Sequence, residues 1–329
     1  MISAQKHKCA VFCGELKSKK LFDFLYETYN VKTFKTNSDF YNSCDVKLEN
    51  IEIIVLTVDS ILTKEFLEKM PNLVLVVSLT TSVTHIARET LLSLQAAQKL
   101  ITLRNFWDQM EDVSGAADLA LTFILMGARK IAAGKIRKFN NLNVDRDNDY
   151  ISHEFSSLRI GIIGYGRIGK RVGKYLKGLG INVVIYDVDT KKTEGELVYK
   201  SVAELLNNVH GALISVSVDD HRSKIISKDL LKNDLNNKEL FLVNISRGEI
   251  VAEEEILASL EQSRISCYLT DVISGNLKHK LDKTESRRFK KLSELGKIVV
   301  TPHLGGFTVE STEKTQNIVA HFLLGRFTV

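Results

Sequence analysis

The sequence predicts an α/β fold in which helices cover parallel strands, and it predicts two domains. Short apolar runs rich in β-branched residues recur along the chain, at residues 51–56, 73–77, 160–163, 183–186, 212–218, 240–245, 265–269 and 297–300. Segments with the apolar spacing of helices separate most of these runs, as at 202–206 and 253–260. Strands that alternate with helices are typical of βαβ units, which build a parallel sheet covered on both faces. A chain of 329 residues is too long for one ordinary core, so we expect two domains.

The composition is typical of a soluble globular protein and argues against several functions. The chain is 44% hydrophobic and 26% charged, and its net charge of +5 is spread along its length. The densest basic run, Arg287–Lys291, follows acidic residues and predicts a solvated helix face rather than a nucleic-acid surface. The most apolar helical stretch, 116–128, is too short to span a bilayer. The cysteines lack metal-ligand spacing and the N-terminus lacks a secretory core, so we expect a cytoplasmic protein with no metal site and no membrane or nucleic-acid partner.

A glycine-rich turn is the most informative segment. The buried-strand pattern at 160–163 runs into Gly164-x-Gly166-x-x-Gly169, and a helical apolar stripe follows. A strand, this turn and a helix together form a dinucleotide-binding fingerprint, in which the helix N-terminus receives the pyrophosphate. The next strand ends at Asp187, 18 residues after Gly169, where an acid can bind the adenosine ribose and repel an extra phosphate. The segment therefore predicts an NAD site rather than an NADP site, although a glycine turn without a ligand stays an alternative.

The stretch Gly161–Asp187 resembles the D-isomer-specific 2-hydroxyacid dehydrogenases. The resemblance continues at Asn244–Val251, Thr270–Val272 and Thr301–Thr308, and it covers residues 50–329. It implies two Rossmann-like parallel-sheet domains. A flavodoxin-like substrate domain, residues 1–105 and 302–329, would be interrupted by an NAD-binding domain of residues 106–301. The helix predicted at 113–130 would then support a homodimer.

The resemblance also implies a catalytic set. Arg247 matches the arginine that binds the substrate, and a guanidinium suits a planar carboxylate because it can donate two parallel hydrogen bonds. His303 matches the acid/base, for which imidazole has a suitable pKa of about 6.5. The third position departs from the family, because Asn276 stands where a glutamate usually orients the histidine and raises its pKa. Glu285 is an alternative source of that carboxylate.

Further residues follow from the same resemblance. Backbone N–H groups of Ser82 and Val83 would bind the substrate carboxylate together with Arg247. Asp59 would repel a phosphorylated substrate, and His85 fits a packing or surface role better than a ligand contact. The residues expected to bind NAD are Gly164, Gly166, Arg167, Ile168, Gly169, Asp187, Val216, Ile245 and Asp271, the last beside the nicotinamide carboxamide.

Two functions fit these residues. The first is an NAD-dependent dehydrogenase that interconverts a small 2-keto acid and its D-2-hydroxy acid. The second is an NAD(H)-binding protein of low or no activity, acting as a redox sensor or scaffold like the co-repressors related to this family. The missing glutamate and the altered carboxylate turn favour the second function, whereas the presence of Arg247 and His303 favours the first.

Overall fold

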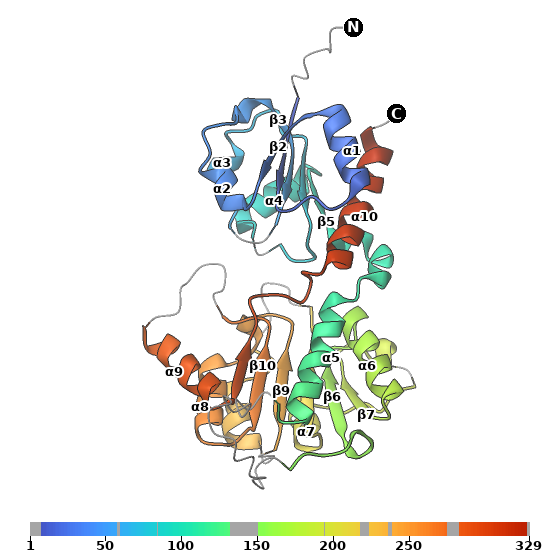
Figure 1. The fold of residues 1–329 in the computed structure, drawn as a ribbon, viewed down its shortest axis with the longest axis vertical. Coiled ribbons are helices and arrows are strands. Elements are labelled where there is room, and N and C mark those ends of the chain that lie inside the picture. The colour runs from blue at the N-terminus through green and yellow to red at the C-terminus, as the bar shows by residue number, and fades with distance from the viewer. Residues whose placement is uncertain are drawn as a thin grey trace, which may run out of the picture. The chain divides into compact units, whose positions relative to one another are not determined.

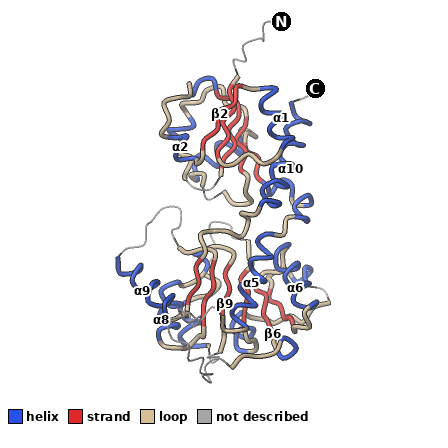
Figure 2. The backbone as a smooth tube through the Cα atoms, in the orientation of Figure 1, coloured by secondary structure: helices blue, strands red, loops and turns tan. Residues whose placement is uncertain are grey.

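The computed structural model describes residues 8–57, 60–83, 85–131, 151–193, 195–217, 224–235, 239–274 and 283–327. The chain forms two compact units (Figure 1). Unit 1 consists of Met1–Val113 and Thr308–Val329, and unit 2 consists of Ser114–Phe307. Each unit has its own parallel sheet with helices on both faces, as Figure 2 shows with strands in red and helices in blue. The predicted α/β fold class is therefore confirmed.

The sheet of unit 1 has the strand order β2-β1-β3-β4-β5, and every neighbouring pair is parallel. This is the flavodoxin-like order. The strands are β1 (Cys9–Cys13), β2 (Asn30–Phe34), β3 (Ile51–Leu56), β4 (Leu75–Ser78) and β5 (Leu100–Thr102). One face is covered by α1 (Lys19–Thr28) and α10 (Val309–Phe327), and the other by α2 (Asn37–Tyr41), α3 (Lys64–Leu67) and α4 (Arg88–Ala96).

Helix α10 returns the end of the chain to unit 1. Its Gln316, which is 1% exposed, accepts hydrogen bonds from the backbone N–H groups of Lys17 and Ser18 and donates one to the carbonyl of Glu15. An amide that satisfies three backbone groups near the start of α1 specifies where α10 lies. The last helix is therefore part of the first unit, although more than 190 residues of unit 2 separate the two segments.

The sheet of unit 2 has the strand order β11-β10-β9-β8-β6-β7, again all parallel. An isolated parallel bridge between Ile185 and Val198 extends it beyond β7. The strands are β6 (Arg159–Ile163), β7 (Asn182–Tyr186), β8 (Gly211–Ile214), β9 (Phe241–Asn244), β10 (Cys267–Thr270) and β11 (Ile298–Val300). Helices α5 (Gly115–Ala128) and α6 (Arg167–Gly178) cover one face, and α7 (Val202–Asn207), α8 (Glu253–Glu261) and α9 (Lys283–Glu294) cover the other.

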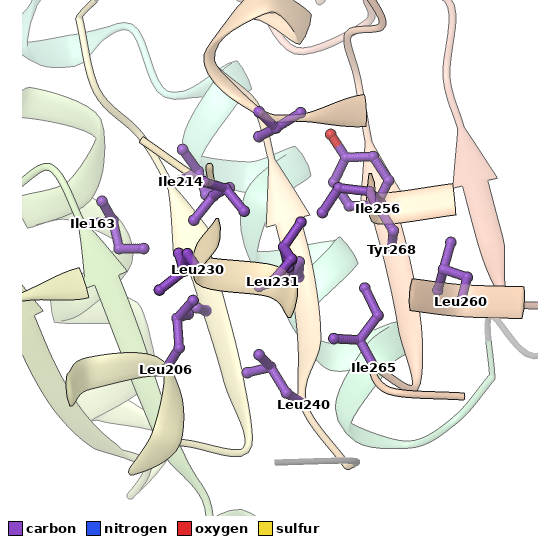
Figure 3. Close-up of a cluster of buried hydrophobic side chains, with 14 of the residues drawn as sticks. Ile163, Leu206, Ile214, Leu230, Leu231, Leu240, Ile256, Leu260, Ile265 and Tyr268 are labelled. Atoms are coloured by element: carbon purple, nitrogen blue, oxygen red, sulfur yellow. The ribbon is translucent and has the colours of Figure 1, made fainter. Parts of the chain in front are cut away.

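The two faces of this sheet are buried in separate apolar clusters. Ile162 packs toward α5 and α6, whereas its neighbour Ile163 packs toward α7 and α8, as alternation along a strand requires. Figure 3 shows the second cluster, in which branched side chains surround the ring of Tyr268. Burial on both faces explains why the strands of this sheet read as continuous apolar runs. Among the described residues, no helix is long and apolar enough to cross a membrane.

The unit boundaries differ from the expected domain boundaries by a few residues. Met110 and Val113 belong to the core of unit 1, so this unit extends to residue 113 instead of 105. At the other boundary, backbone N–H groups of Leu304 and Gly305 donate to Asp271 of unit 2, and unit 2 extends to Phe307 instead of 301. As a consequence, His303 belongs to the same unit as the glycine-rich turn.

Candidate active site

The candidate residues of unit 2 gather at one edge of its sheet. They follow the carboxyl ends of β6, β7, β8, β9, β10 and β11. The chain leaves β6 toward β7 on one side and returns to β8 on the other, so the strand order reverses between β6 and β8. In open parallel sheets, ligands bind outside the carboxyl ends of the strands at such a reversal.

The glycine-rich turn has the space and the backbone shape that a pyrophosphate needs. Gly164 has a φ of +93°, which favours glycine, and Ser215 Oγ fixes its carbonyl with a hydrogen bond of 2.8 Å. A Cβ at Gly169 would lie 2.2 Å from the Gly164 carbonyl oxygen, so the first turn of α6 meets the loop backbone directly. A Cβ at Gly166 would meet nothing within 4 Å, which leaves that side of the loop open. These residues therefore fit a dinucleotide phosphate held at a helix N-terminus.

The remaining cofactor candidates border this loop. Arg167 and Ile168 form the first residues of α6, and both are partly buried. Val216 approaches the loop closely, because its Cγ1 would lie 2.8 Å from a Cβ at Gly164. Ile245, which follows β9, donates its N–H to the Ile214 carbonyl at the end of β8. Backbone contacts thus hold together the segments after β6, β8 and β9.

Asp187 lies directly after β7 and is held by its own loop. Its Oδ2 accepts from the Tyr165 N–H at 2.6 Å, and its Oδ1 accepts from the Asp189 N–H at 2.8 Å. A carboxylate offers about four acceptor positions, so others remain for ribose hydroxyls. The acid expected at the ribose end is therefore present and oriented by backbone donors.

A buried amide shapes the turn that carries Arg247. The Oδ1 atom of Asn244 accepts from the Ser246 N–H at 2.9 Å, and its Nδ2 donates to the Arg247 carbonyl at 2.9 Å and to the Tyr268 hydroxyl at 3.1 Å. Asn244 was not among the predicted site residues, although it opens the motif at 244–251. Arg247 itself is partly buried and donates from Nη1 to the Ser246 carbonyl.

The residue after Arg247 allows two loops to touch. A Cβ at Gly248 would lie 2.2 Å from backbone atoms of Ile273 and Ser274, in the segment after β10. Real Cβ atoms essentially never approach backbone so closely, so only glycine fits without displacing the segment. The turn with Arg247 and the segment that begins at Asp271 are thus in close backbone contact.

Asp271 holds the loop that carries His303. It is 2% exposed, and its carboxylate accepts from Thr301 Oγ1 at 2.6 Å, from the Leu304 N–H at 2.6 Å and from the Gly305 N–H at 2.8 Å. His303, between these donors, has a φ of +58°, a left-handed conformation that is uncommon outside glycine. Such conformations persist where surrounding contacts enforce them, often at functional sites. Three of about four acceptor positions of Asp271 are committed to this loop, which leaves room for one cofactor contact.

Arg247 acts on His303 electrostatically. The His303 side chain keeps contact with solvent, but the surrounding protein displaces part of its water and lowers its pKa. The positive charge of Arg247 lowers this pKa further, whereas the negative charge of Asp271 raises it. The net pKa lies below the ordinary value, so the free protein holds a neutral imidazole near a guanidinium at neutral pH.

Other predicted residues lie elsewhere. Asn276 and Asp59 lie outside the described residues, as does the side chain of Glu285. Ser82 and Val83 belong to unit 1, in a loop after β4 that Thr80 stabilises by donating to the Ser82 carbonyl at 2.8 Å. His85 is fully buried, and its Nε2 lies 3.0 Å from Ser78 Oγ, which agrees with the packing role. In the part of the chain that the structure describes, no group of three or more His, Cys, Asp or Glu residues could hold a metal ion.

Comparison with known proteins identifies the family. The model of the D-isomer specific 2-hydroxyacid dehydrogenase family, NAD binding domain, matches residues 121–305, more than half of the chain. The chain belongs to this family. The D-2-hydroxyacid dehydrogenases are oxidoreductases that use NAD or NADP, and the resemblance seen in the motifs is thereby confirmed.

Individual relatives are distant in sequence but cover nearly the whole chain. A glyoxylate reductase from Pyrococcus furiosus is 24% identical over 289 residues, which is 84% of this chain and 80% of the relative. A D-lactate dehydrogenase from Aquifex aeolicus, solved with NAD and lactic acid, has a TM-score of 0.80 at 20% identity and covers 97% of this chain and 95% of its own. An NADPH-dependent glyoxylate/hydroxypyruvate reductase from Sinorhizobium meliloti, solved with NADP and malonate, has a TM-score of 0.75 at 14% identity and covers 98% and 94%.

Proposed function

We propose that this D-2-hydroxyacid dehydrogenase family member interconverts a small 2-keto acid and its D-2-hydroxy acid with NAD(H). The observation that carries the proposal is the placement of Arg247 and His303 at one edge of the unit 2 sheet. Both residues lie on turns at the carboxyl edge of the sheet that also bears the phosphate loop, and the charge of one shifts the pKa of the other. The names of relatives point to glyoxylate, hydroxypyruvate and lactate as the first acids to test.

The two side chains have complementary tasks in this reaction. The Arg247 guanidinium binds the substrate carboxylate and polarises the carbonyl, because its fork of donors matches planar oxygens. Neutral His303 accepts the hydroxyl proton during oxidation, and protonated His303 returns it to the carbonyl oxygen during reduction. Backbone N–H groups of Ser82 and Val83 assist in binding the carboxylate. When bound, the cofactor would supply the hydride acceptor or donor; the 164–169 loop would hold its pyrophosphate and Asp187 its adenosine ribose.

We further propose that the cofactor is NAD(H) rather than NADP(H). Asp187 and Asp189 stand at the end of β7, and a 2′-phosphate next to these carboxylates would be repelled. The measurement is kcat/KM for NADH against NADPH with the same keto acid. A preference for NADPH would contradict this assignment.

The decisive test of the proposed reaction uses two substitutions with matched controls. Arg247→Lys and His303→Gln should each lower kcat/KM for keto-acid reduction by about 10²–10⁴-fold, because a positioned cation and an acid/base each contribute on this scale. The controls Arg129→Lys and His153→Gln change exposed residues of the same unit and should keep wild-type rates. The dissociation constant of NADH should stay unchanged in all four variants. Equal rates in the active-site and control variants would refute the assignment.

The alternative function, an NAD(H)-binding sensor or scaffold, gives a different result in the same assays. It predicts that wild-type protein binds NADH tightly yet turns over none of the keto acids. It also predicts that Asn276→Glu, which restores the carboxylate usual in the family, gains no activity. Turnover by wild-type protein on any of these acids at a rate typical of enzymes, about 1–10³ per second, would exclude it.

We also propose a cytoplasmic homodimer that uses α5. Half of the residues of α5 are buried inside unit 2. Leu121 and Leu125, among its remaining residues, are only partly buried. Light scattering coupled to size-exclusion chromatography should give a mass near twice the chain mass of 37.0 kDa. A monomeric mass at micromolar concentration would contradict the dimer.

A further inference from the structure

One residue of the phosphate loop forms hydrogen bonds with both ends of the segment that follows β7. Tyr165 stands between Gly164 and Gly166, and its N–H donates to Asp187 Oδ2 at 2.6 Å. Its side-chain hydroxyl donates to Glu196 Oε1 at 2.7 Å. We call residues 187–193 and 195–196 the ribose-side segment. The same tyrosine therefore holds the segment at its first and its last residue.

The hydroxyl contact is part of a partly buried ionic network. Both Glu196 oxygens accept from Lys177 Nζ, at 2.6 and 2.7 Å, and the Glu196 side chain is only 15% exposed. The Tyr165 ring is 6% exposed and packs against α6, where a Cβ at Gly173 would lie 3.3 Å from the tyrosine hydroxyl. The anchor thus joins the phosphate loop, the end of α6 and the ribose-side segment.

The protonation states suit a strong hydrogen bond. Burial raises the pKa of Tyr165, and the hydrogen bond to Glu196 raises it further, so the hydroxyl stays protonated and donates. Burial alone would raise the pKa of Glu196, but the hydrogen bonds from Lys177 and Tyr165 outweigh burial and leave that pKa below the ordinary value. A neutral donor therefore meets an ionised acceptor, which is the stronger class of hydrogen bond.

We propose that Tyr165, acting through Glu196, is a positioning residue that sets the affinity for NADH and its preference over NADPH. The inference rests on the proposed use of NAD(H). The pyrophosphate cradle and the ribose acid are linked through one residue, so the distance between them is fixed before a dinucleotide binds. Preorganisation of this kind removes an ordering cost from binding. Without the Glu196 anchor, the segment that begins at Asp187 is held at one end only, and its carboxylates oppose a 2′-phosphate less effectively.

The test removes the hydroxyl of Tyr165 and keeps its aromatic ring. Tyr165→Phe should raise the dissociation constant of NADH by about tenfold, measured by calorimetric titration, which corresponds to about 1.4 kcal/mol. The dissociation constant of NADPH should change less, so the preference between the two narrows. The loss of kcat/KM for NADH should come from KM more than from kcat, because the ribose-side segment positions the cofactor ribose and not the reacting groups. Tyr175→Phe is the matched control, because Tyr175 lies on α6, against which Tyr165 packs, and its hydroxyl donates to Asp118 at 3.1 Å, away from the ribose-side segment.

A double-mutant cycle shows whether the effect passes through Glu196. Tyr165→Phe, Glu196→Ala and the double variant should raise the NADH dissociation constant by similar factors, since each removes the same anchor. Additive effects would overturn the proposal. So would a Tyr165→Phe protein that melts earlier without its cofactor yet keeps the affinity and preference of Tyr175→Phe, because that result describes a purely structural tyrosine. If wild-type protein binds neither dinucleotide, the proposed function fails first, and this inference falls with it.

Discussion

Replacing Asp271 by Asn should destabilise unit 2 and impair the His303 loop together. The carboxylate accepts from Thr301 Oγ1 and from the N–H groups of Leu304 and Gly305, and it is 2% exposed. In one orientation of the amide, its NH₂ faces the Gly305 N–H; in the other, it faces the Leu304 N–H. A backbone donor is left without an acceptor in either orientation: the buried N–H of Gly305 in the first, the partly buried N–H of Leu304 in the second.

The magnitude follows from these contacts. When the NH₂ faces Gly305, the unsatisfied buried N–H of Gly305 costs about 1–3 kcal/mol. The two hydrogen bonds that survive, from Thr301 and Leu304, each lose about 1 kcal/mol because their acceptor becomes neutral. The total is about 3–5 kcal/mol. At about 2–4 °C per kcal/mol for a unit of this size, the melting temperature should fall by about 10 °C.

Thermal unfolding and steady-state kinetics check this prediction. Thr301→Val removes one donor and keeps the carboxylate, so it should cost only about 1 kcal/mol. Asp271→Asn should also lower kcat, because the loop with the left-handed His303 loses the acceptor that enforces it. A melting temperature within 2 °C or so of wild type would show that Asp271 does not hold this loop, and the reasoning above would be wrong.

Three further predictions follow from the same structure. Gly248→Ala should lower kcat/KM at least tenfold, because the new Cβ would lie 2.2 Å from the backbone of Ile273 and Ser274. Wild-type kinetics would show that the turn with Arg247 and the segment after β10 can move apart at no cost. Because the pKa of His303 is lowered, kcat/KM for hydroxy-acid oxidation should stay constant as pH falls to about 6.5, whereas kcat/KM for keto-acid reduction should already decline above that pH. Asn276→Glu should shift the decline in reduction to higher pH, and an unchanged pH profile for reduction would refute this role of position 276. Burial and a neighbouring histidine lower the pKa of His210, so folding favours its neutral form, and the free energy of unfolding should decrease as pH falls below about 6.5. In denaturant titrations, His210→Asn should weaken this dependence of the free energy of unfolding on pH, and an unchanged dependence would contradict the prediction.

The parallel strands of unit 2 could be predicted because both faces of the sheet are buried. The apolar runs at 160–163 and 183–186 fall within β6 and β7, and the glycine turn between β6 and α6 has a sequence signature of its own. The run at 212–218 predicts a longer strand than β8, which ends at Ile214. The regular strand ends where the Ser215 side chain bonds to the phosphate loop, and an apolar pattern does not report such a contact.

Unit 1 was harder to predict at its start. Strand β2 lies at the edge of the sheet and has the burial pattern exposed, partly buried, exposed, exposed, partly buried. An edge strand with polar residues lacks the alternation that marks a half-buried strand. Strand β1 beside it is fully buried, but its five residues form too short an apolar run to stand out in a segment without motifs.

Within the site, the sequence identified side chains by motif but not the residues that hold them. Asp271 was predicted as a cofactor residue, and no motif indicated that its carboxylate also accepts hydrogen bonds from the 301–305 loop. Tyr165 and Glu196 lie 31 residues apart and meet only because β7 and its following segment return to the phosphate loop. Hydrogen bonds of this kind depend on tertiary structure, and no local period or spacing encodes them.

The distribution of site residues between the units has a consequence for how the enzyme can vary. The turns that carry Arg247, His303 and Asp271 are held by hydrogen bonds and close backbone contacts within unit 2. The loop with Ser82 and Val83 belongs to unit 1, whose core is separate. If that loop binds the substrate carboxylate as proposed, changes in it should alter which keto acid is accepted and should appear in KM, while the pH dependence proposed for His303 stays the same. Relatives can then differ in substrate specificity while the residues of unit 2 stay the same, which is consistent with the different acids named for proteins of this fold.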